Sequence, residues 1–222
     1  MKKLKTGLLV VMGVLSFTSC ATFENEVEAP QEQLLQMYTL SRDTNGAYSI
    51  NYNVADKTSA TSHKNIGSKT NEIYLDKVGY REQKNYKNNF SLDDDKIKIR
   101  FVDNNTSGST QITVEDENAT FAKGANNNRF LKEYEVTGNA DGTFQLDFEI
   151  NEGIQSEFVY NKESSTYEIH LSKGDSTEKQ FSRAIDIADD GVLKVDFVNH
   201  KYAGKGEATG PGRKPRIIII TD

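Results

Sequence analysis

Short segments in which apolar and polar residues alternate strictly constrain the fold of this chain more than any other feature. Residues 48–54, 96–101, 144–150 and 193–197 all follow this pattern. Shorter stretches continue it at 73–75, 112–114 and 167–171. A period of two puts every second side chain on the same face of an extended backbone. These segments therefore predict half-buried β-strands.

Turn residues lie between the alternating segments. Asn45-Gly46, Asp141-Gly142 and Asp190-Gly191 are the clearest examples, since glycine and asparagine tolerate positive φ. Helical periodicity is weak, and only residues 31–38 and 181–188 are helix candidates. The pattern predicts an all-β antiparallel sandwich of about ten strands with few or no helices, and a β-barrel is the alternative.

Four consecutive isoleucines, residues 217–220, break the alternation. A strand that is apolar on both sides is best used in the centre of a sheet, with both of its faces covered. At a sheet edge the same strand would promote aggregation. The run therefore predicts a central strand.

A longer regularity links four entries from turn to strand. Each entry has a turn residue followed by apolar residues at fixed offsets, and the entries start at Asn45, Asp94, Asp141 and Asp190. The starts are 49, 47 and 49 residues apart. Such a period suggests tandem hairpin units. The rest of each unit does not align, and alternation with turn residues in an all-β chain produces such matches by chance, so a true repeat is left open and is not predicted.

The N-terminus has the character of a signal peptide. Lys2, Lys3 and Lys5 precede an apolar run at 8–15, which is too short to span a bilayer. Leu15-Ser16-Phe17-Thr18-Ser19-Cys20 then resembles the lipobox of bacterial lipoprotein precursors. The resemblance implies that Cys20, the only cysteine, carries a diacylglyceryl group and takes up palmitate. An incidental thiol near an ordinary cleavage site is the alternative.

The predicted organisation has three parts: a signal peptide at 1–19, acylated Cys20 with a flexible acidic stalk at 20–33, and one all-β domain at 34–222. In such lipoproteins an aspartate after the cysteine signals inner-membrane retention. Ala21 stands at that position here, which favours lipid anchoring in the outer membrane. The acidic residues at 23–28 resemble the tags of some surface lipoproteins. Cell surface and periplasmic face are both open.

The net charge limits the classes of partner that this chain is expected to bind. The net charge of −6 becomes −9 once residues 1–19, with three lysines and no acidic residue, are removed. An acidic chain repels nucleic acid, so no nucleic-acid partner is expected. The expected partners are the membrane, through the Cys20 anchor, and an envelope or extracellular protein or glycan.

Residues 103–108 resemble the first half of a calcium-binding EF-hand loop. Asp103, Asn105 and Ser107 offer oxygen ligands at alternate positions, and Gly108 follows at the sharp turn. The twelfth position, which needs a glutamate, is Val114. A polar hairpin loop accounts for these residues, so no metal site is predicted and these three are kept only as candidates.

The segment 200–216 is locally cationic within this acidic chain. Its five basic residues are Lys201, Lys205, Arg213, Lys214 and Arg216. As a binding site it would contact an anionic partner such as an acidic glycan. A surface loop that balances neighbouring acids is the other interpretation.

Catalytic motifs are not evident. His63, His170 and His200 are the only histidines, and no two have the sequence spacing of a zinc site. No G-x-S-x-G nucleophile motif occurs. The chain is therefore predicted to be a non-catalytic, membrane-anchored binding module without a cofactor. A lipocalin-like carrier of a small apolar ligand and an envelope hydrolase are the alternatives.

Overall fold

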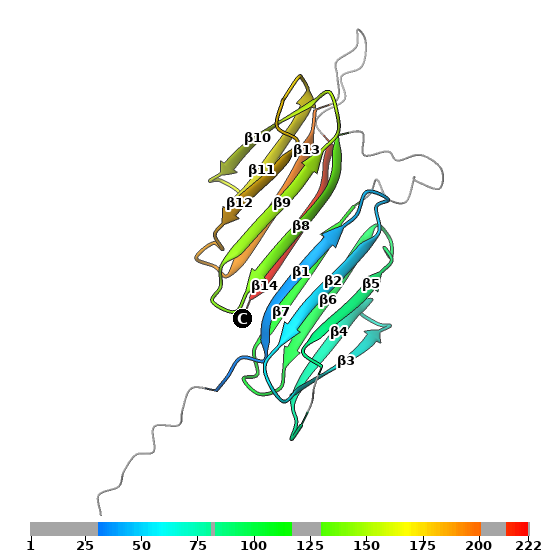
Figure 1. The fold of residues 1–222 in the computed structure, drawn as a ribbon, viewed down its shortest axis with the longest axis vertical. Helices are drawn as coiled ribbons and strands as arrows, with labels where there is room; N and C mark the ends of the chain where they lie inside the picture. Colours follow the sequence, from blue (N-terminus) through cyan, green and yellow to red (C-terminus); the bar gives the residue numbers. More distant parts are fainter. Residues whose placement is uncertain (1–30, 81–82, 117–129, 201–211, 222) are drawn as a thin grey trace, which may run out of the picture. The chain divides into compact units, whose positions relative to one another are not determined.

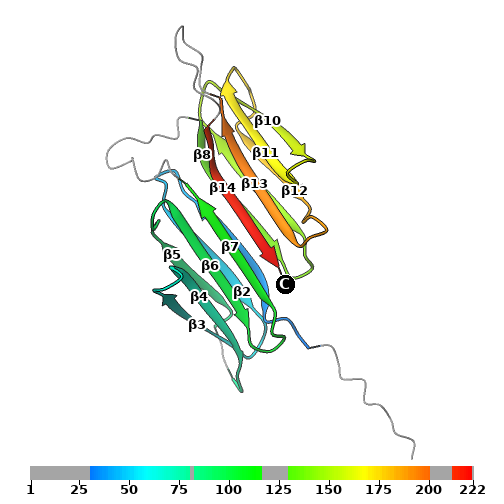
Figure 2. The same ribbon diagram turned by 180° about the vertical axis from the view of Figure 1, so that it is seen from behind.

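Two stacked β-sheets, one of six strands and one of eight, make up the fold (Figures 1 and 2). The computed structural model describes residues 31–80, 83–116, 130–200 and 212–221. Within these ranges the chain forms fourteen strands and no helix. All of these residues belong to one compact unit that begins at Gln31.

The first half of the described chain contributes seven strands: β1 (Leu35–Arg42), β2 (Tyr48–Val54), β3 (Thr58–Asn65), β4 (Thr70–Lys77), β5 (Asn85–Phe90), β6 (Lys96–Asp103) and β7 (Ser109–Glu115). The second half contributes another seven: β8 (Leu131–Asn139), β9 (Phe144–Ile150), β10 (Ile154–Asn161), β11 (Thr166–Lys173), β12 (Gln180–Ile185), β13 (Val192–Asn199) and β14 (Gly212–Thr221).

Strand pairing in the second half repeats that in the first. The six-stranded sheet has the order β12-β9-β8-β1-β2-β5, and the eight-stranded sheet has the order β10-β11-β13-β14-β7-β6-β4-β3. Each order reads the same from both ends if β8–β14 are renumbered as β1–β7. The fold is therefore an internal duplication, in which two seven-stranded units join through the antiparallel pairs β1–β8 and β7–β14.

The strand registers give the duplication a pseudo-twofold axis. Leu40 pairs with Val136, and these residues occupy equivalent positions 96 residues apart. The same offset relates the strand entries at Asn45 and Asp141. The repeat is thus about twice as long as the 47–49-residue spacing suggested, because that spacing compares strands of different sheets.

Aromatic packing is duplicated along with the backbone. In the first half Tyr52 stacks on Tyr86 at a ring-centroid distance of 5.2 Å and meets Phe101 edge-on at 5.1 Å. The matching contacts of Phe148, to Phe181 at 4.8 Å and to Phe197 at 5.7 Å, have the same geometries. These rings lie in one continuous core between the two sheets. Both halves are therefore built around the same aromatic cluster.

The predicted sandwich is confirmed, and the barrel alternative is wrong. The described strands leave each sheet with two free edges, β12 and β5 in one and β10 and β3 in the other. The alternation predicted neither these four edge strands nor β1 and β8 in the interior of the six-stranded sheet, so fourteen strands are found instead of about ten. An edge strand is partly exposed to water and tolerates polar residues that blur the pattern.

Two further expectations need correction. The eight-stranded sheet is mixed, since β4–β6 and β11–β13 pair in parallel. The chain leaves this sheet after β4 to form β5 in the other sheet, so it returns as β6 in the same direction. The helix candidates at 31–38 and 181–188 lie mostly in β1 and β12, where cross-strand pairing outweighs the weak helical periodicity.

The isoleucine run lies in β14, which is central in the eight-stranded sheet, as predicted. Ile217 and Ile219 are fully buried in the core between the sheets. Ile218 and Ile220, on the opposite face, are half-buried. Because β14 also pairs with β7, this strand joins the two halves of the duplication.

Candidate functional site

The two halves differ most at one pair of equivalent core positions, Arg42 in β1 and Gly138 in β8. The Arg42 side chain is only 4% exposed, and its Nε donates a 3.1 Å hydrogen bond to Asp116 Oδ2. The Tyr48 hydroxyl donates to the same oxygen at 2.7 Å. Arg42, Asp116 and Tyr48 thus form a buried polar cluster in the first half.

Charge and burial oppose each other in this cluster. Burial tends to lower the pKa of Arg42, but the neighbouring Tyr48 and Asp116 outweigh it, so the pKa is raised and the guanidinium stays charged. Burial, Tyr134 and Asp116 together raise the pKa of Tyr48 well above its ordinary value. A neutral Tyr48 can therefore keep donating its hydrogen bond to the carboxylate.

The equivalent positions in the second half carry no charge. Gly138 replaces Arg42, Phe144 replaces Tyr48 and Thr221 replaces Asp116. Thr221 matches Asp116 because the two backbone amides donate to equivalent carbonyls, those of Gly191 and Asp95. The second half therefore has neither the buried ion pair nor the long side chain that fills this position in the first half.

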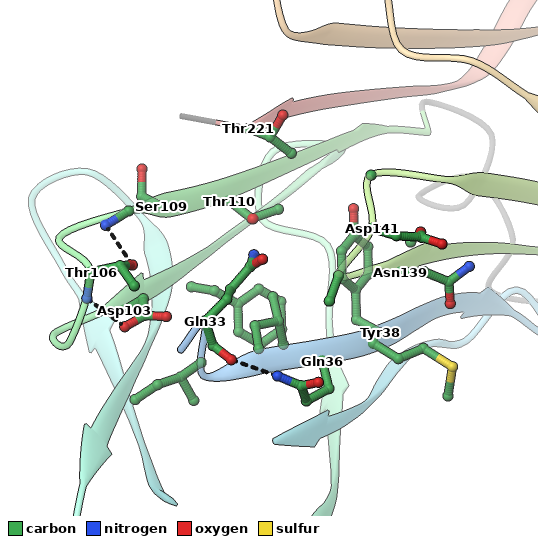
Figure 3. Close-up of a pocket in the computed structure, with 18 of the residues that line it drawn as sticks. Gln33, Gln36, Tyr38, Asp103, Thr106, Ser109, Thr110, Asn139, Asp141 and Thr221 are labelled. Carbon is green, nitrogen blue, oxygen red and sulfur yellow. Dashed lines mark hydrogen bonds between the residues drawn. The ribbon is translucent and has the colours of Figure 1, made fainter. Parts of the chain in front are cut away.

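A pocket of about 550 Å³ lies beside Gly138 and is lined by residues of both halves (Figure 3). Its apolar lining comes from Leu75, Phe101, Tyr38 and Phe144, at one end of the sandwich. Polar side chains surround it: Gln33 and Gln36 before and in β1, Thr106, Ser109 and Thr110 around the start of β7, Asn139 and Asp141 at the β8–β9 turn, and Thr221. This size suits a small ligand.

Gly138 is required for this arrangement. A Cβ atom there would lie 2.6 Å from Tyr38 Cζ and 2.7 Å from Tyr38 Oη. The Tyr38 ring therefore lies directly against the backbone of β8, with which β1 pairs in register. No larger residue fits at position 138 unless Tyr38 moves.

The Tyr38 hydroxyl is buried and has no hydrogen-bond partner among the described residues. Burial raises the pKa of Tyr38 well above its ordinary value, so the phenol stays protonated. A buried polar group without a partner is costly, by about 1–3 kcal/mol. The hydroxyl of Tyr134, the equivalent residue of the second half, has the same burial.

The pocket offers neutral hydrogen-bonding groups and no basic residue among the described residues that line it. Its two acidic residues already accept hydrogen bonds from other groups of the chain. Asp103 accepts from the amides of Leu34, Asn105 and Thr106 at 2.7–3.0 Å. Asp141 accepts from the amide and hydroxyl of Thr143. The pocket chemistry therefore favours an uncharged polar ligand.

The calcium-loop candidates have structural roles. Asp103 anchors the β6–β7 loop, Asn105 Nδ2 donates to the carbonyl of Glu32, and the Ser107 amide donates to the Asp103 carbonyl. No group of three or more His, Cys, Asp or Glu side chains in the described ranges is arranged to hold a metal ion. This loop therefore acts as one wall of the pocket.

The cationic candidates are only partly described. Lys201 and Lys205 lie outside the described residues, and only the backbone of Arg213 and Lys214 is described, in β14. Arg216 forms two 2.7 Å hydrogen bonds with Asp196 on the paired strand β13. Its guanidinium is thus engaged in an ion pair within the sheet.

The predicted signal peptide, Cys20 and most of the stalk lie outside the described residues. Glu32, at the end of the predicted stalk, pairs with Lys77 of β4. Within the ranges that the structure describes, no helix is long and apolar enough to cross a membrane.

Sequence reasoning missed the pocket because nothing marks Gly138 as unusual within its strand. It also separated His170 from His200, which the structure brings into contact, with His170 Nδ1 2.7 Å from His200 Nε2. Alignment of the two halves is the signal that would reveal the pocket, since it sets Arg42 against Gly138. The contact between His170 and His200 depends on the strand order.

Comparisons with protein-family models, with curated proteins and with solved structures found nothing that matches this chain. The class of protein is therefore defined by fold and site together: an internally duplicated β-sandwich with a pocket beside Gly138, where the residues of the two halves differ.

Proposed function

We propose that this chain is a lipid-anchored protein of a bacterial outer membrane whose β-sandwich is a non-catalytic binding module for a small, uncharged glycan unit. The pocket at Gly138 is the observation that carries the binding proposal. The lipobox-like segment ending at Cys20 supports the anchor.

The lining favours a neutral sugar over other ligands. Amide and hydroxyl groups at the rim, such as those of Gln33, Gln36 and Asn139, pair readily with sugar hydroxyls. Apolar walls can cover the C–H face of a ring. An anionic glycan would lack a cationic partner among the described lining residues, and a purely apolar ligand would leave the polar rim unpaired.

The acidic residues of the pocket support a non-catalytic role. Hydrolysis of a glycoside normally needs two available carboxyl groups on either side of the bond. Asp103 and Asp141 are the acidic residues of the pocket, and both already accept hydrogen bonds from other groups of the chain. The pocket is thus suited to holding a sugar without cleaving it.

A panel of neutral and acidic oligosaccharides tests the binding proposal, using the protein with Cys20→Ser and calorimetry to measure affinity. Gln33→Ala with Asn139→Ala is expected to weaken binding of a neutral sugar at least tenfold. Asn51→Ala, an exposed amide on the outer face of β2, is the matched control and should leave affinity unchanged. Binding of acidic glycans alone, or of a deglycosylated protein partner, would contradict the proposal.

The anchor is tested separately by labelling cells with palmitate. The wild-type protein should take up the label and sediment with membranes, whereas Cys20→Ser should do neither. A Cys20→Ser protein that still sediments with membranes would refute the anchor and leave the pocket untouched. Protease added to intact cells then distinguishes the cell surface from the periplasmic face.

A further inference from the structure

A second group of polar side chains lies away from the pocket, on β11 and just after β13. His170 Nδ1 and His200 Nε2 are 2.7 Å apart, and the two rings stack at a centroid distance of 5.0 Å. His170 Nε2 lies 3.0 Å from Glu168 Oε2. Asn161 Nδ2 donates to the other oxygen of Glu168 at 3.1 Å. The two histidines therefore belong to one connected network.

Parallel pairing of β11 with β13 brings these histidines together although they are 30 residues apart. Leu171 pairs with Asn199, the last residue of β13, so His200 follows beside the C-terminal end of β11. The His200 amide donates to the Leu171 carbonyl at 2.8 Å, which fixes the backbone there. The contact is thus a product of the strand order.

The network orients the imidazole of His170. Glu168 is a buried carboxylate held by Asn161, and it accepts a hydrogen bond from His170 Nε2–H. The proton on Nε2 leaves the lone pair of Nδ1 pointing at His200. In histidine metal sites, one imidazole nitrogen usually donates a hydrogen bond to a carboxylate while the other nitrogen binds the metal ion.

We propose that His170 Nδ1 and His200 Nε2 together bind one divalent transition-metal ion of the kind that prefers imidazole, Zn²⁺ or Cu²⁺. Two nitrogens at about 2.0–2.1 Å from a tetrahedral ion lie about 3.3 Å apart. The present 2.7 Å separation must therefore widen by about half an ångström, and the proton that joins the two nitrogens must move through solvent to His200 Nδ1. His200 is exposed at the end of its strand and has room for this movement.

The remaining coordination positions are left to water or to an external ligand. Because no third His, Cys, Asp or Glu completes a metal-binding group among the described residues, the site is open and binds metal in exchange with solution. A two-imidazole site of this kind favours Cu²⁺ over Zn²⁺, following the general affinity order of divalent ions.

The first half of the molecule has the same frame without the imidazoles. Glu72 accepts from the Tyr74 hydroxyl at 2.7 Å and from Asn65 Nδ2, and these residues match Glu168, His170 and Asn161. His200 corresponds to Asn104. The carboxylate and its amide partner are therefore part of the duplicated frame, and the two imidazoles are particular to the second half.

This correspondence supplies conservative test variants. His170→Tyr and His200→Asn each install the residue of the first half, so the frame that the fold already tolerates is retained. Calorimetric titration with Zn²⁺ and with Cu²⁺ should give one site per chain for the wild-type protein. Each variant should weaken that site at least tenfold. His63→Ala, which removes the remaining histidine from exposed strand β3, should change nothing.

Two further readouts separate ligation from a merely structural role. Electron paramagnetic resonance of bound Cu²⁺ should show two nitrogen ligands in the wild type and one in either variant. Glu168→Gln should weaken Zn²⁺ binding about 10- to 100-fold while both nitrogens still bind Cu²⁺. Unchanged affinity in His170→Tyr and His200→Asn, or equal loss in His63→Ala, would overturn the proposal. Neutral-sugar binding should be unaffected in all of these variants.

Discussion

The two halves of this molecule share a backbone and an aromatic core, yet they treat one core position in opposite ways. In the first half Arg42 fills the position and pairs with Asp116. In the second half Gly138 has no side chain, the Tyr38 ring lies against it, and a pocket of about 550 Å³ lies beside it. A duplicated sandwich can thus keep one copy of a site closed by an ion pair while the other becomes available to a ligand.

The outer face of the eight-stranded sheet shows the same division. Glu72 and Glu168 are held alike, but the first is bonded to a tyrosine and the second to a histidine that reaches another histidine. The two histidines belong to the second half alone, whereas the pocket beside Gly138 is lined by residues of both halves.

Asp116→Ala should have the largest effect on stability, because it leaves the Arg42 charge buried without its partner. Removing one member of a buried ion pair costs about 3–5 kcal/mol in the free energy of unfolding. Thr221→Ala, at the equivalent position, should cost less than about 1 kcal/mol. Urea unfolding of both variants measures the difference, and a similar small cost in both would show that Asp116 does not stabilise Arg42.

Gly138→Ala should be next, since its Cβ would lie within 2.8 Å of three Tyr38 atoms. Overpacking of this kind costs about 1–3 kcal/mol. Displacement of Tyr38 should also narrow the pocket and weaken ligand binding. Gly79→Ala is the control, because a Cβ there would meet nothing within 4 Å. Equal stability of the two variants would mean that Tyr38 adapts without strain.

Alkaline pH should destabilise the first half more than the second, since Tyr48 and Tyr52 stand where the second half has Phe144 and Phe148. Burial raises the pKa of Tyr52 to about 12. The raised pKa means that burial of neutral Tyr52 contributes its full stability below pH 10. This contribution is lost as the pH rises through the pKa of Tyr52 in the folded protein.

The free energy of unfolding should therefore fall less between pH 10 and 12 in Tyr52→Phe than in the wild type. The expected difference is up to about 2 kcal/mol, since one pKa unit corresponds to about 1.4 kcal/mol. Denaturant unfolding at several pH values measures this slope. Tyr160→Phe, an exposed ring of β10, should leave the slope as it is. If both variants change it equally, burial of Tyr52 is not its source.

The smallest effect is expected at the turn after β2. Lys57 adopts a left-handed conformation with φ of 58°, whereas its counterpart Gly153 has φ of 71°. Lys57→Gly should stabilise the protein by about 0.5–1 kcal/mol, and Gly153→Ala should destabilise it by about 1 kcal/mol. Thermal unfolding compares the two. A stabilising Gly153→Ala would contradict the shared geometry of these turns.

Much of the fold could be predicted from local pattern. Several interior strands alternate clearly because one face of each is buried and the other is more exposed, as in Phe144–Ile150, although β1 and β8 were not predicted. Isoleucines 217–220 indicated a central strand for the same reason. Edge strands such as β3 and β5 were missed, because a strand with one unpaired edge needs fewer apolar residues.

The sequence by itself determined the β-sandwich class, the positions of its turns and the central place of β14. These depend on the local spacing of apolar residues and of residues that tolerate turns. Only the tertiary structure decided the duplication, the pocket beside Gly138 and the contact of His170 with His200. Each of these depends on which strands become neighbours, and strand partners are selected by packing of the whole core.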